Sequence, residues 1–348
     1  MNTYMNYIIE QTKQLLAIDS PTGYTKQAAQ YVFDEYRSLG YEPTFTKKGG
    51  VLVCIHNPNT NTSKDDGILM EAHIDTLGGM VSEIASNGRL HITPLGGLNA
   101  NNVEGENCKI ITKTNKVYDG TYQLKNASLH VNKEYSSIQR GFDTMEIVLD
   151  EMACFKEEIE QLDIMVGDIV CFDPRTTITP SGYIKSRFLD DKLSVAILLG
   201  YSKYLKENTP SISRKIYHHI TIFEEVGHGG SASIPNDIDE ILSIDMGCVG
   251  DGLNCKEHQV SICAKDSGGP YHYDVVSKLI SCAKEEKLDF AVDIYPYYGS
   301  DAEAGLRAGA DVKHGLIGPG VYASHGYERS HMKGVENTFL LLKAYMEK

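Results

Sequence analysis

Two adjacent carboxylates, Glu224 and Glu225, follow the apolar run Ile-Thr-Ile-Phe at 220–223, and Val-Gly comes directly after them. Neighbouring carboxylates repel each other, so placing them near a strand end is costly unless a positive charge lies close by. Successive side chains on a strand point to opposite faces. One carboxylate can then bind a cation while the other transfers protons, which is the chemistry of a metal-dependent hydrolase.

Other segments share this design, a largely apolar run that ends in His, Asp or Glu. The catalytic sites of α/β proteins form at the carboxyl ends of strands, so converging strand ends would gather these side chains. An acidic pair, Asp190–Asp191, opens a helix and adds to them. The further runs are 68–75 with His73 and Asp75, 242–245 with Asp245, and 322–325 with His325.

Imidazole and carboxylate groups are zinc ligands, and catalytic zinc sites keep one position for water. Five ligands cannot fill one tetrahedral site and leave that position free, but they can serve two metals if one carboxylate bridges. Paired metals acidify a shared water and hold a substrate oxygen. His73 and Asp75 share a face if their strand stays regular, so Asp75 is predicted to orient a ligating imidazole.

Each motif is weak by itself. Because Glu is mostly exposed in proteins, an isolated Glu224–Glu225 pair most simply lies at a solvated strand end. An isolated His73 is most simply a hydrogen-bonded core residue, and Asp190–Asp191 a helix N-cap. His218 and His219 lie inside a predicted strand and are interpreted as structural.

Length and charge narrow the class of protein. The chain has 348 residues, enough for about two domains. Its formal net charge of -14 argues against nucleic acid and anionic membranes as partners. No apolar run approaches the length of a membrane span, and no signal peptide is apparent. None of the eight cysteines forms a Cys-x-x-Cys pair, which favours a reducing compartment and a cytoplasmic location.

The pattern of elements predicts an α/β domain with a mixed sheet and helices on both faces, interrupted by a small β-barrel-like domain. The α/β domain covers 1–78 and 179–348, and the inserted β-rich domain covers 79–178. Helices are expected at 4–18, 25–39, 144–161, 191–206, 271–286 and 334–346, and strands at 51–55, 68–74, 215–225, 241–246, 290–295 and 312–317.

The chain resembles the tetrahedral and glutamyl aminopeptidases, family forty-two of the metallopeptidases, which are cytosolic enzymes with two metals. The matching motifs stand in family order over essentially the whole chain, with the inserted domain between the first and the second. They are Ala-His-Ile-Asp (72–75), Arg-Phe-Leu-Asp-Asp-Lys (187–192), Phe-Glu-Glu-Val-Gly (223–227), Ser-Ile-Asp-Met-Gly (243–247), Ser-Asp-Ala (300–302) and Ser-His (324–325).

The resemblance implies a role for each matching residue. His73 and Asp245 would bind one metal, Glu225 and His325 the other, and Asp190 would bridge them. The peptide bond after the bridging Asp is often cis in such sites. The carboxylate of Glu224 would act as the general base. The metals are expected to be two divalent ions per subunit, zinc in the first place, with cobalt or another first-row metal as alternatives.

Two segments depart from the family pattern. An Arg that commonly follows the Val-Gly by two residues is replaced by Gly229, which leaves His228 as a candidate substitute. The usual Pro-Val-Glu after the last His is Gly326-Tyr327-Glu328, which retains Glu328. Asp301 matches a family position near the site. Both a structural role and a contact to substrate are alternatives for it.

The expected function is removal of N-terminal residues from peptides by a dinuclear metal-activated water. The alternatives are hydrolysis of acylated or blocked amino acids and peptides, and a non-catalytic metal-binding scaffold. Endoglucanase activity is not expected, because no carboxylate pair suits glycoside chemistry better than metal binding. By resemblance, the chain assembles as a homo-oligomer built from dimers, up to a tetrahedral dodecamer, with the inserted domain at the contacts.

Overall fold

The computed structural model describes residues 3–58 and 66–348. The chain forms two compact units, residues 1–75 with 175–348 and residues 76–174. The first unit is built on a large mixed sheet and the second on a closed barrel. This arrangement confirms the predicted α/β class with a small barrel-like unit.

The sheet of the first unit has the path β1-β2-β12-β3-β13-β17-β18-β11-β10, with β14 and β15 paired to β17 and β16 paired to β15. Its strands are β1 (Thr44–Phe45), β2 (Val51–His56), β3 (Gly67–His73), β10 (Thr177–Ile178), β11 (Tyr183–Ser186), β12 (Ile216–Thr221), β13 (Ile238–Ile244), β14 (Gly247–Val249), β15 (Val260–Lys265), β16 (Phe290–Ile294), β17 (Lys313–Tyr322) and β18 (Glu328–His331).

The centre of this sheet is parallel, because β12, β3, β13 and β17 run in one direction. Every residue of β3 is buried, as expected for a parallel strand covered on both faces. Parallel strands place their carboxyl ends at one edge of the sheet. That edge is where His73 and Asp245 lie.

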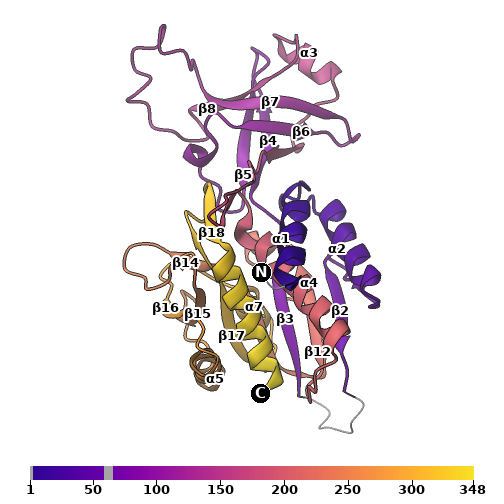
Figure 1. Ribbon diagram of the computed structural model, residues 1–348. Coiled ribbons are helices and arrows are strands. Elements are labelled where there is room, and N and C mark those ends of the chain that lie inside the picture. The colour runs from indigo at the N-terminus through magenta and orange to yellow at the C-terminus, as the bar shows by residue number, and fades with distance from the viewer. Residues whose placement is uncertain (1–2, 59–65) are drawn as a thin grey trace. The chain divides into compact units, whose positions relative to one another are not determined.

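Helices pack on the sheet. Figure 1 shows α1 (Thr3–Leu16), α4 (Leu189–Asn208) and α7 (Met332–Glu347) together over one face, and these helices contact one another. The helix α6 (Asp301–Arg307) contacts β3, β13 and β17. The remaining helices of this unit are α2 (Lys26–Ser38), which packs on β2, and α5 (Tyr273–Glu285), which packs on β15.

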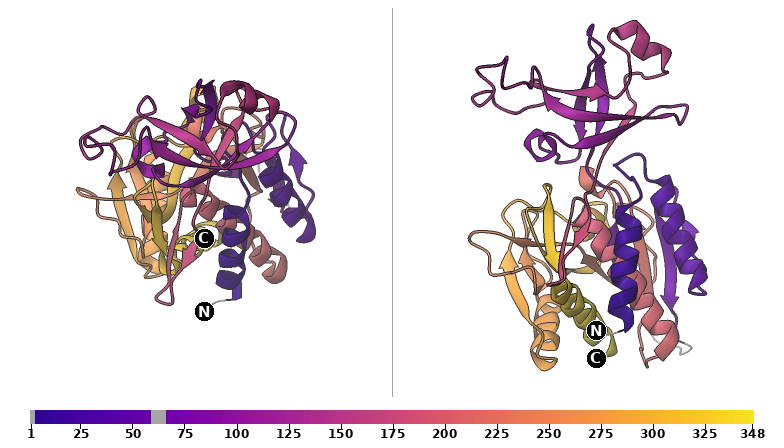
Figure 2. Two further views of the ribbon diagram at one scale, coloured as in Figure 1. Left: turned by 90° about the horizontal axis from the view of Figure 1, so that it is seen from above. Right: turned by 45° about the horizontal axis from the view of Figure 1, so that its top comes forward.

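The second unit is a closed barrel, and its strands are seen in Figure 2. They pair in the order β4-β5-β8-β7-β6-β9. Its strands are antiparallel to their neighbours. The elements are β4 (Gly78–Ile84), β5 (Leu90–Leu95), a 3-10 helix (Ala100–Val103), β6 (Asn107–Ile111), β7 (Val117–Leu124), β8 (Met145–Leu149), α3 (Lys156–Gln161) and β9 (Ile169–Phe172).

Parts of the predicted element map are wrong. The helix predicted at 144–161 is the strand β8 followed by the short helix α3. Met145, Ile147 and Leu149 are buried with a period of two, which favours a strand that pairs with β7 over a helix. The strand predicted at 215–225 ends at Thr221. The helix α6 and the strands β15 and β18 were not predicted.

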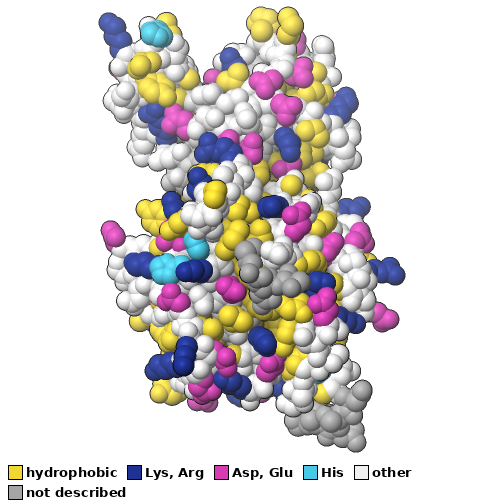
Figure 3. Space-filling view, viewed as in Figure 1, with side chains coloured by type: hydrophobic (Ala, Val, Ile, Leu, Met, Phe, Trp, Pro, Cys, Tyr) yellow, Lys and Arg dark blue, Asp and Glu magenta, His cyan; other side chains and the backbone are white. Residues whose placement is uncertain are grey.

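None of the helices in the described part of the chain combines the length and the apolar composition that a membrane crossing requires. All eight cysteines are free thiols. On the face seen in Figure 3, acidic and basic side chains are interspersed with hydrophobic ones.

Candidate active site

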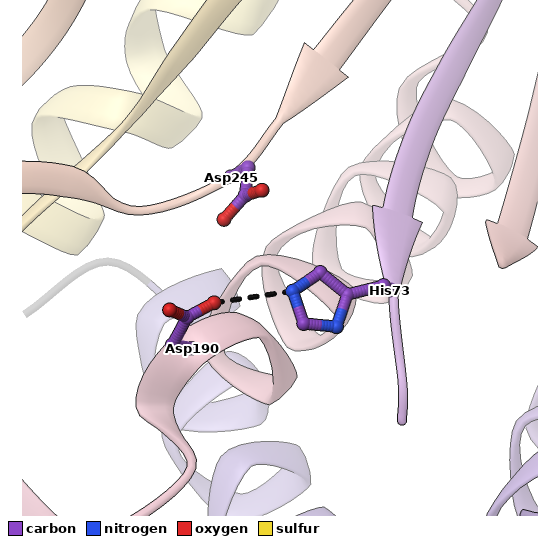
Figure 4. A group of neighbouring side chains, drawn as sticks. All are labelled: His73, Asp190 and Asp245. Atoms are coloured by element: carbon purple, nitrogen blue, oxygen red, sulfur yellow. Dashed lines mark hydrogen bonds and ion pairs between the residues drawn. The ribbon is translucent and has the colours of Figure 1, made fainter. Parts of the chain in front are cut away.

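A His and two Asp side chains meet at the carboxyl edge of the sheet. His73 ends β3, Asp245 follows the parallel neighbour β13, and Asp190 lies in the first turn of α4. Figure 4 shows the three side chains pointing toward one another. One ligand atom from each lies within 4.8 Å of the others, and Nε2 of His73 is 3.1 Å from Oδ1 of Asp190. The geometry suits a single cation.

Asp190 also reaches the second predicted His. Its Oδ2 lies 3.5 Å from Nε2 of His325, which stands in the turn after β17. The two oxygens of Asp190 therefore face two different imidazoles. The peptide bond between Asp190 and Asp191 is cis.

Glu224 and Glu225 are not on a strand, so the prediction that a strand directs them to opposite faces is wrong. The chain leaves β12 through Phe223, which has a left-handed φ of 68°, and continues in a 3-10 turn from Glu224 to Val226. The turn still separates the two carboxylates. Glu224 Oε2 lies 3.7 Å from His73 Nε2, and Glu225 Oε2 lies 3.6 Å from His325 Nε2.

Asp75 holds this turn. Its carboxylate accepts hydrogen bonds from the backbone N–H of Glu224 at 3.2 Å and of Glu225 at 3.4 Å, and from the hydroxyl of Thr22 at 2.7 Å. The contact to the imidazole differs from the predicted one. Nδ1 of His73 lies 2.9 Å from the backbone oxygen of Asp75 and 3.6 Å from its Oδ1. The orienting atom nearest the ring thus belongs to the main chain.

Glu328 resembles Asp75 in that its carboxylate also accepts hydrogen bonds from two backbone N–H groups of the site. Its two oxygens accept hydrogen bonds from the backbone N–H of Asp190 at 3.1 Å and of His325 at 3.0 Å. The side chain is buried. This carboxylate therefore fixes the main chain beneath two predicted ligands.

The cluster carries more negative charge than its histidines balance. Burial raises the pKa of Asp245 to about 7, and the charge of Asp190 adds to that effect. Burial raises the pKa of Glu224 and of Glu225 well above the usual range, and nearby carboxylates reinforce the rise. Oε1 of Glu225 is buried without a hydrogen-bond partner among the described residues. An unpartnered oxygen in a set of O and N donors is what divalent cations would satisfy, so the residues fit such ions.

The surplus of negative charge also affects the histidines, because it favours their protonated, positively charged form. Burial lowers the pKa of His325, but the hydrogen bond and the charge of Asp190 outweigh it and raise the value to about 10. The pKa of Asp190 is lowered even though burial opposes this, because both imidazoles donate to it. The ionised carboxylate at the centre of the group is therefore the favoured form.

The segment after the turn is fixed by Asp301 and Lys48. The Asp301 carboxylate accepts from the Gly230 backbone N–H at 2.6 Å and from the Thr221 hydroxyl. A Cβ at position 229 would clash with Asp301, so the family Arg has no room there. The Lys48 ammonium donates to the carbonyl of His228 and to that of Gly229, the latter at 2.7 Å. His228 itself stacks on Phe223 at 5.1 Å between ring centroids.

A cavity of about 700 Å³ opens beside these groups, a size typical of small-ligand sites. Five of the predicted residues line it, and His73 contacts one of them, Asp190. The five are Asp190, Glu224, Glu225, Asp245 and His325. Sequence reasoning missed Thr22, Lys48 and the lining residue Arg307. These lie in turns or at a helix end, and no local pattern in the chain singles them out.

The chain matches the model of a known family, described as M42 glutamyl aminopeptidase, over residues 49–341. It is also similar to the protein named "Putative aminopeptidase YhfE" from Bacillus subtilis (strain 168). The two are 42% identical over 345 residues, which cover 99% of each chain.

Solved structures show the same fold. Aminopeptidase APDkam598 from the archaeon Desulfurococcus kamchatkensis has a TM-score of 0.87 at 24% identity, over 99% of this chain and 96% of that one. The TET1 peptidase of Pyrococcus horikoshii, which can assemble into a tetrahedron or a large octahedral shell, has a TM-score of 0.84 at 22% identity, over 97% of this chain and 99% of that one.

Proposed function

The chain belongs to the M42 glutamyl aminopeptidase family, and we propose that it is a metal-dependent aminopeptidase that removes N-terminal residues from peptides. The position of Asp190 carries the proposal. Its Oδ1 and Oδ2 lie 3.1 Å and 3.5 Å from the imidazoles of His73 and His325. A carboxylate placed in this way can serve two cations at once.

Two divalent ions fit the donor set. His73 and Asp245 would hold one ion, Glu225 and His325 the other, and Asp190 both. Zinc suits these ligands, and so do cobalt and other first-row metals. When bound, the ions would polarise the scissile carbonyl and make water a better nucleophile at neutral pH.

Glu224 is the proposed proton carrier. Its carboxylate lines the cavity and lies on the His73 side of the group. Burial, reinforced by nearby carboxylates, raises the pKa of Glu224 above its usual range. A carboxylate at the wall of a cavity can serve as a general base. Glu224 would take a proton from the attacking water and deliver it to the nitrogen of the leaving peptide.

The remaining carboxylates hold the machinery in place. Asp75 fixes the backbone of the Glu224–Glu225 turn, and Glu328 fixes the backbone of Asp190 and His325. Each satisfies two N–H groups with one side chain. Glu224 and the proposed ligands therefore enter the reaction in a preset geometry.

The direct test is Glu224→Gln, which keeps the shape of the side chain but cannot carry a proton. Hydrolysis of leucyl p-nitroanilide should fall by roughly 10²- to 10⁴-fold. Metal content per subunit, measured by mass spectrometry, should stay at the wild-type value. Full activity in this variant would rule out Glu224 as the base.

Comparing substrates separates this proposal from its rivals. A free-amine peptide should be cleaved, while the same peptide with an N-acetyl group should not, since an enzyme for blocked peptides has the opposite preference. Reducing sugar should not be released from a glucan. A protein that binds metal but turns over none of these peptides would instead be a non-catalytic metal-binding scaffold.

We also propose a cytoplasmic homo-oligomer in which the barrel unit makes dimer contacts. The free cysteines support a reducing compartment. The barrel unit exposes large hydrophobic side chains, and Figure 3 shows hydrophobic atoms on this unit's surface. They are Val117, Leu129, Val131, Met152, Phe155, Met165 and Val166. Light scattering of the purified protein decides between a monomer, a dimer and a larger shell.

A further inference from the structure

Three tyrosines in the short segment between β16 and α6 have three different environments. Tyr295 is buried, and its hydroxyl is hydrogen-bonded to that of Ser261. Tyr297 lines the cavity but is 96% exposed. Tyr298 also lines the cavity and is half-buried. One segment therefore presents a phenol to the core, a phenol to solvent and a phenol to the site.

The hydroxyl of Tyr298 lies beside Asp245, one of the proposed metal ligands. It donates to the backbone oxygen of Met246 at 3.2 Å. Burial raises the pKa of Asp245 to about 7, and a hydrogen bond from the Tyr298 hydroxyl acts against that rise. The phenolic proton can point to either oxygen, because a hydroxyl rotates to suit its partners. The same proton can therefore turn toward a substrate oxygen placed next to Asp245.

The rest of Tyr298 is held in place. Its ring packs against that of Tyr295, with 5.1 Å between the centroids. Its backbone oxygen accepts hydrogen bonds from the N–H of Ser267 at 3.1 Å and from the Ser267 hydroxyl. A donor on such a fixed support needs little reorganisation at the moment of reaction.

Among the described residues that line the cavity, the other hydroxyl groups have different surroundings. Ser300 is buried and its hydroxyl is 2.8 Å from that of Tyr271. The hydroxyl of Ser324 donates to Asp190 at 3.4 Å. The two remaining hydroxyls belong to exposed tyrosines, Tyr297 and Tyr322. Tyr298 is therefore the hydroxyl donor of this wall that lies beside Asp245.

We propose that the Tyr298 hydroxyl donates a hydrogen bond to the oxygen of the scissile carbonyl as negative charge develops on it. This inference rests on the proposed aminopeptidase function and adds a catalytic residue to the same site. As the water oxygen bonds to the carbonyl carbon, Glu224 takes one water proton and the π electron pair moves onto the carbonyl oxygen. When the C–N bond breaks, that pair restores the C=O bond, the C–N pair leaves with the nitrogen, and Glu224 gives the nitrogen its proton. Tyr298 keeps its own proton throughout, since a phenol stays protonated at neutral pH.

The kinetic test is Tyr298→Phe, which keeps the ring and removes the donor. Hydrogen bonds to a charged oxygen are stronger than those to a neutral carbonyl, so the loss should affect kcat and not KM. The kcat for leucyl p-nitroanilide should fall by roughly 10- to 100-fold, the usual effect of one lost charged hydrogen bond. Both proteins are compared at the metal content of the wild-type holoenzyme, measured by mass spectrometry. A weaker hold of Asp245 on metal is then not counted as lost catalysis.

The neighbouring tyrosines provide matched controls. Tyr295→Phe removes a buried phenol from the ring that packs on Tyr298, and Tyr297→Phe removes an exposed phenol from the cavity wall. Both variants should keep the kcat and KM of the wild type. A fall in kcat in Tyr295→Phe as large as that in Tyr298→Phe would show that the packing of the segment matters and not the donor, which would overturn the proposal.

A binding measurement distinguishes failure of this inference from failure of the proposed function, because it requires no turnover. Calorimetry compares the phosphonic acid analogue of leucine, whose tetrahedral anionic group resembles the intermediate, with leucinol, which has the same amine and side chain without that charge. The ratio of the two affinities should fall by roughly 10- to 100-fold in Tyr298→Phe and stay at the wild-type value in Tyr295→Phe. Such a fall supports the inference even if no peptide is cleaved. An unchanged ratio in Tyr298→Phe would overturn the inference while leaving an active aminopeptidase in place.

Discussion

Two histidines on neighbouring parallel strands are equally buried and have opposite electrostatic character. His218 lies within β12, where its Nδ1 is 2.9 Å from the hydroxyl of Tyr36, and burial lowers its pKa to about 3. His73 ends β3, the strand next to β12. Burial also lowers the pKa of His73, but the hydrogen bond to Asp190 and the charges of other carboxylates raise it well above the usual value.

The difference lies in position along the strand. His218 points into a region packed with Tyr36, Ser202 and Tyr201, where no charge compensates an imidazolium. His73 reaches the edge where chain segments from β13 and α4 converge and bring carboxylates. Burial of a histidine therefore does not identify a site. A site is identified instead by the meeting of strand ends and helix N-termini that bring several polar side chains together.

Removing the charge of Asp190, which lies between His73 and His325, should reduce activity more than any other change proposed here. Asp190→Asn keeps the volume but loses the charge that faces both imidazoles. Peptide hydrolysis should fall by more than the roughly 100-fold typical of residues that act behind ligands, and bound metal per subunit should fall with it. Asp237→Asn, which alters a carboxylate paired with Lys215 away from the cavity, should leave both quantities near wild type. Normal metal content and activity in Asp190→Asn would contradict the shared-ligand assignment.

Weakening the hydrogen bonds that Glu328 makes to the backbone of Asp190 and His325 should have an intermediate effect on metal affinity and activity. Glu328→Gln leaves one oxygen for two backbone N–H donors, those of Asp190 and His325. Metal affinity or activity should drop by about 10- to 100-fold. Titration of the metal-free protein with zinc measures the change in affinity. If zinc affinity and kcat/KM both stay within twofold of wild type, Glu328 contributes packing alone and does not position Asp190 and His325.

Changing the other histidine should affect stability and not catalysis. His218→Asn places an amide oxygen near the position of Nδ1, and activity at pH 7.5 should stay within about threefold of wild type. Because His218 stays neutral in the folded state and takes up a proton near pH 6.5 when unfolded, the wild type loses stability as the pH falls from about 6.5 toward 3.

The asparagine does not titrate, so this loss is absent from the variant. The difference in free energy of unfolding between wild type and His218→Asn should shrink below pH 6.5, by at most about 1.4 kcal/mol per pH unit. Urea denaturation at pH 7.5, 6.0 and 5.0 measures it. A difference that does not vary with pH would show that His218 titrates alike in both states.

The parts of the fold that were predictable have strong local patterns. The amphipathic helices α1 and α2 and the apolar strands β2 and β3 lie close to their predicted ranges, because their burial follows from composition and spacing. The stretch 144–161 was misread because pairing with β7 outweighs a weak local preference for helix. The short helix α6 was missed since its place depends on contacts with β3, β13 and β17.

At the site, the amino-acid sequence specifies which metal-binding and proton-transferring side chains are available. The proposal of two cations and a base rests on the residue types and their order, because side-chain chemistry is a local property. These residues are His73, Asp190, Glu224, Glu225, Asp245 and His325. Tertiary structure decided how these groups face one another. His73 and Asp190 are 117 positions apart, and the parallel sheet with α4 packed on it brings them together.

Tertiary structure also decided the supporting contacts. The turn that separates Glu224 from Glu225, the carboxylates of Asp75 and Glu328 on backbone N–H groups, and the position of Tyr298 in the cavity wall all depend on segments distant in the chain. Hydrogen bonds and charge pairs act over a few ångströms in space, whatever the separation in sequence. No local sequence pattern encodes these contacts, so they can be identified only in the three-dimensional structure.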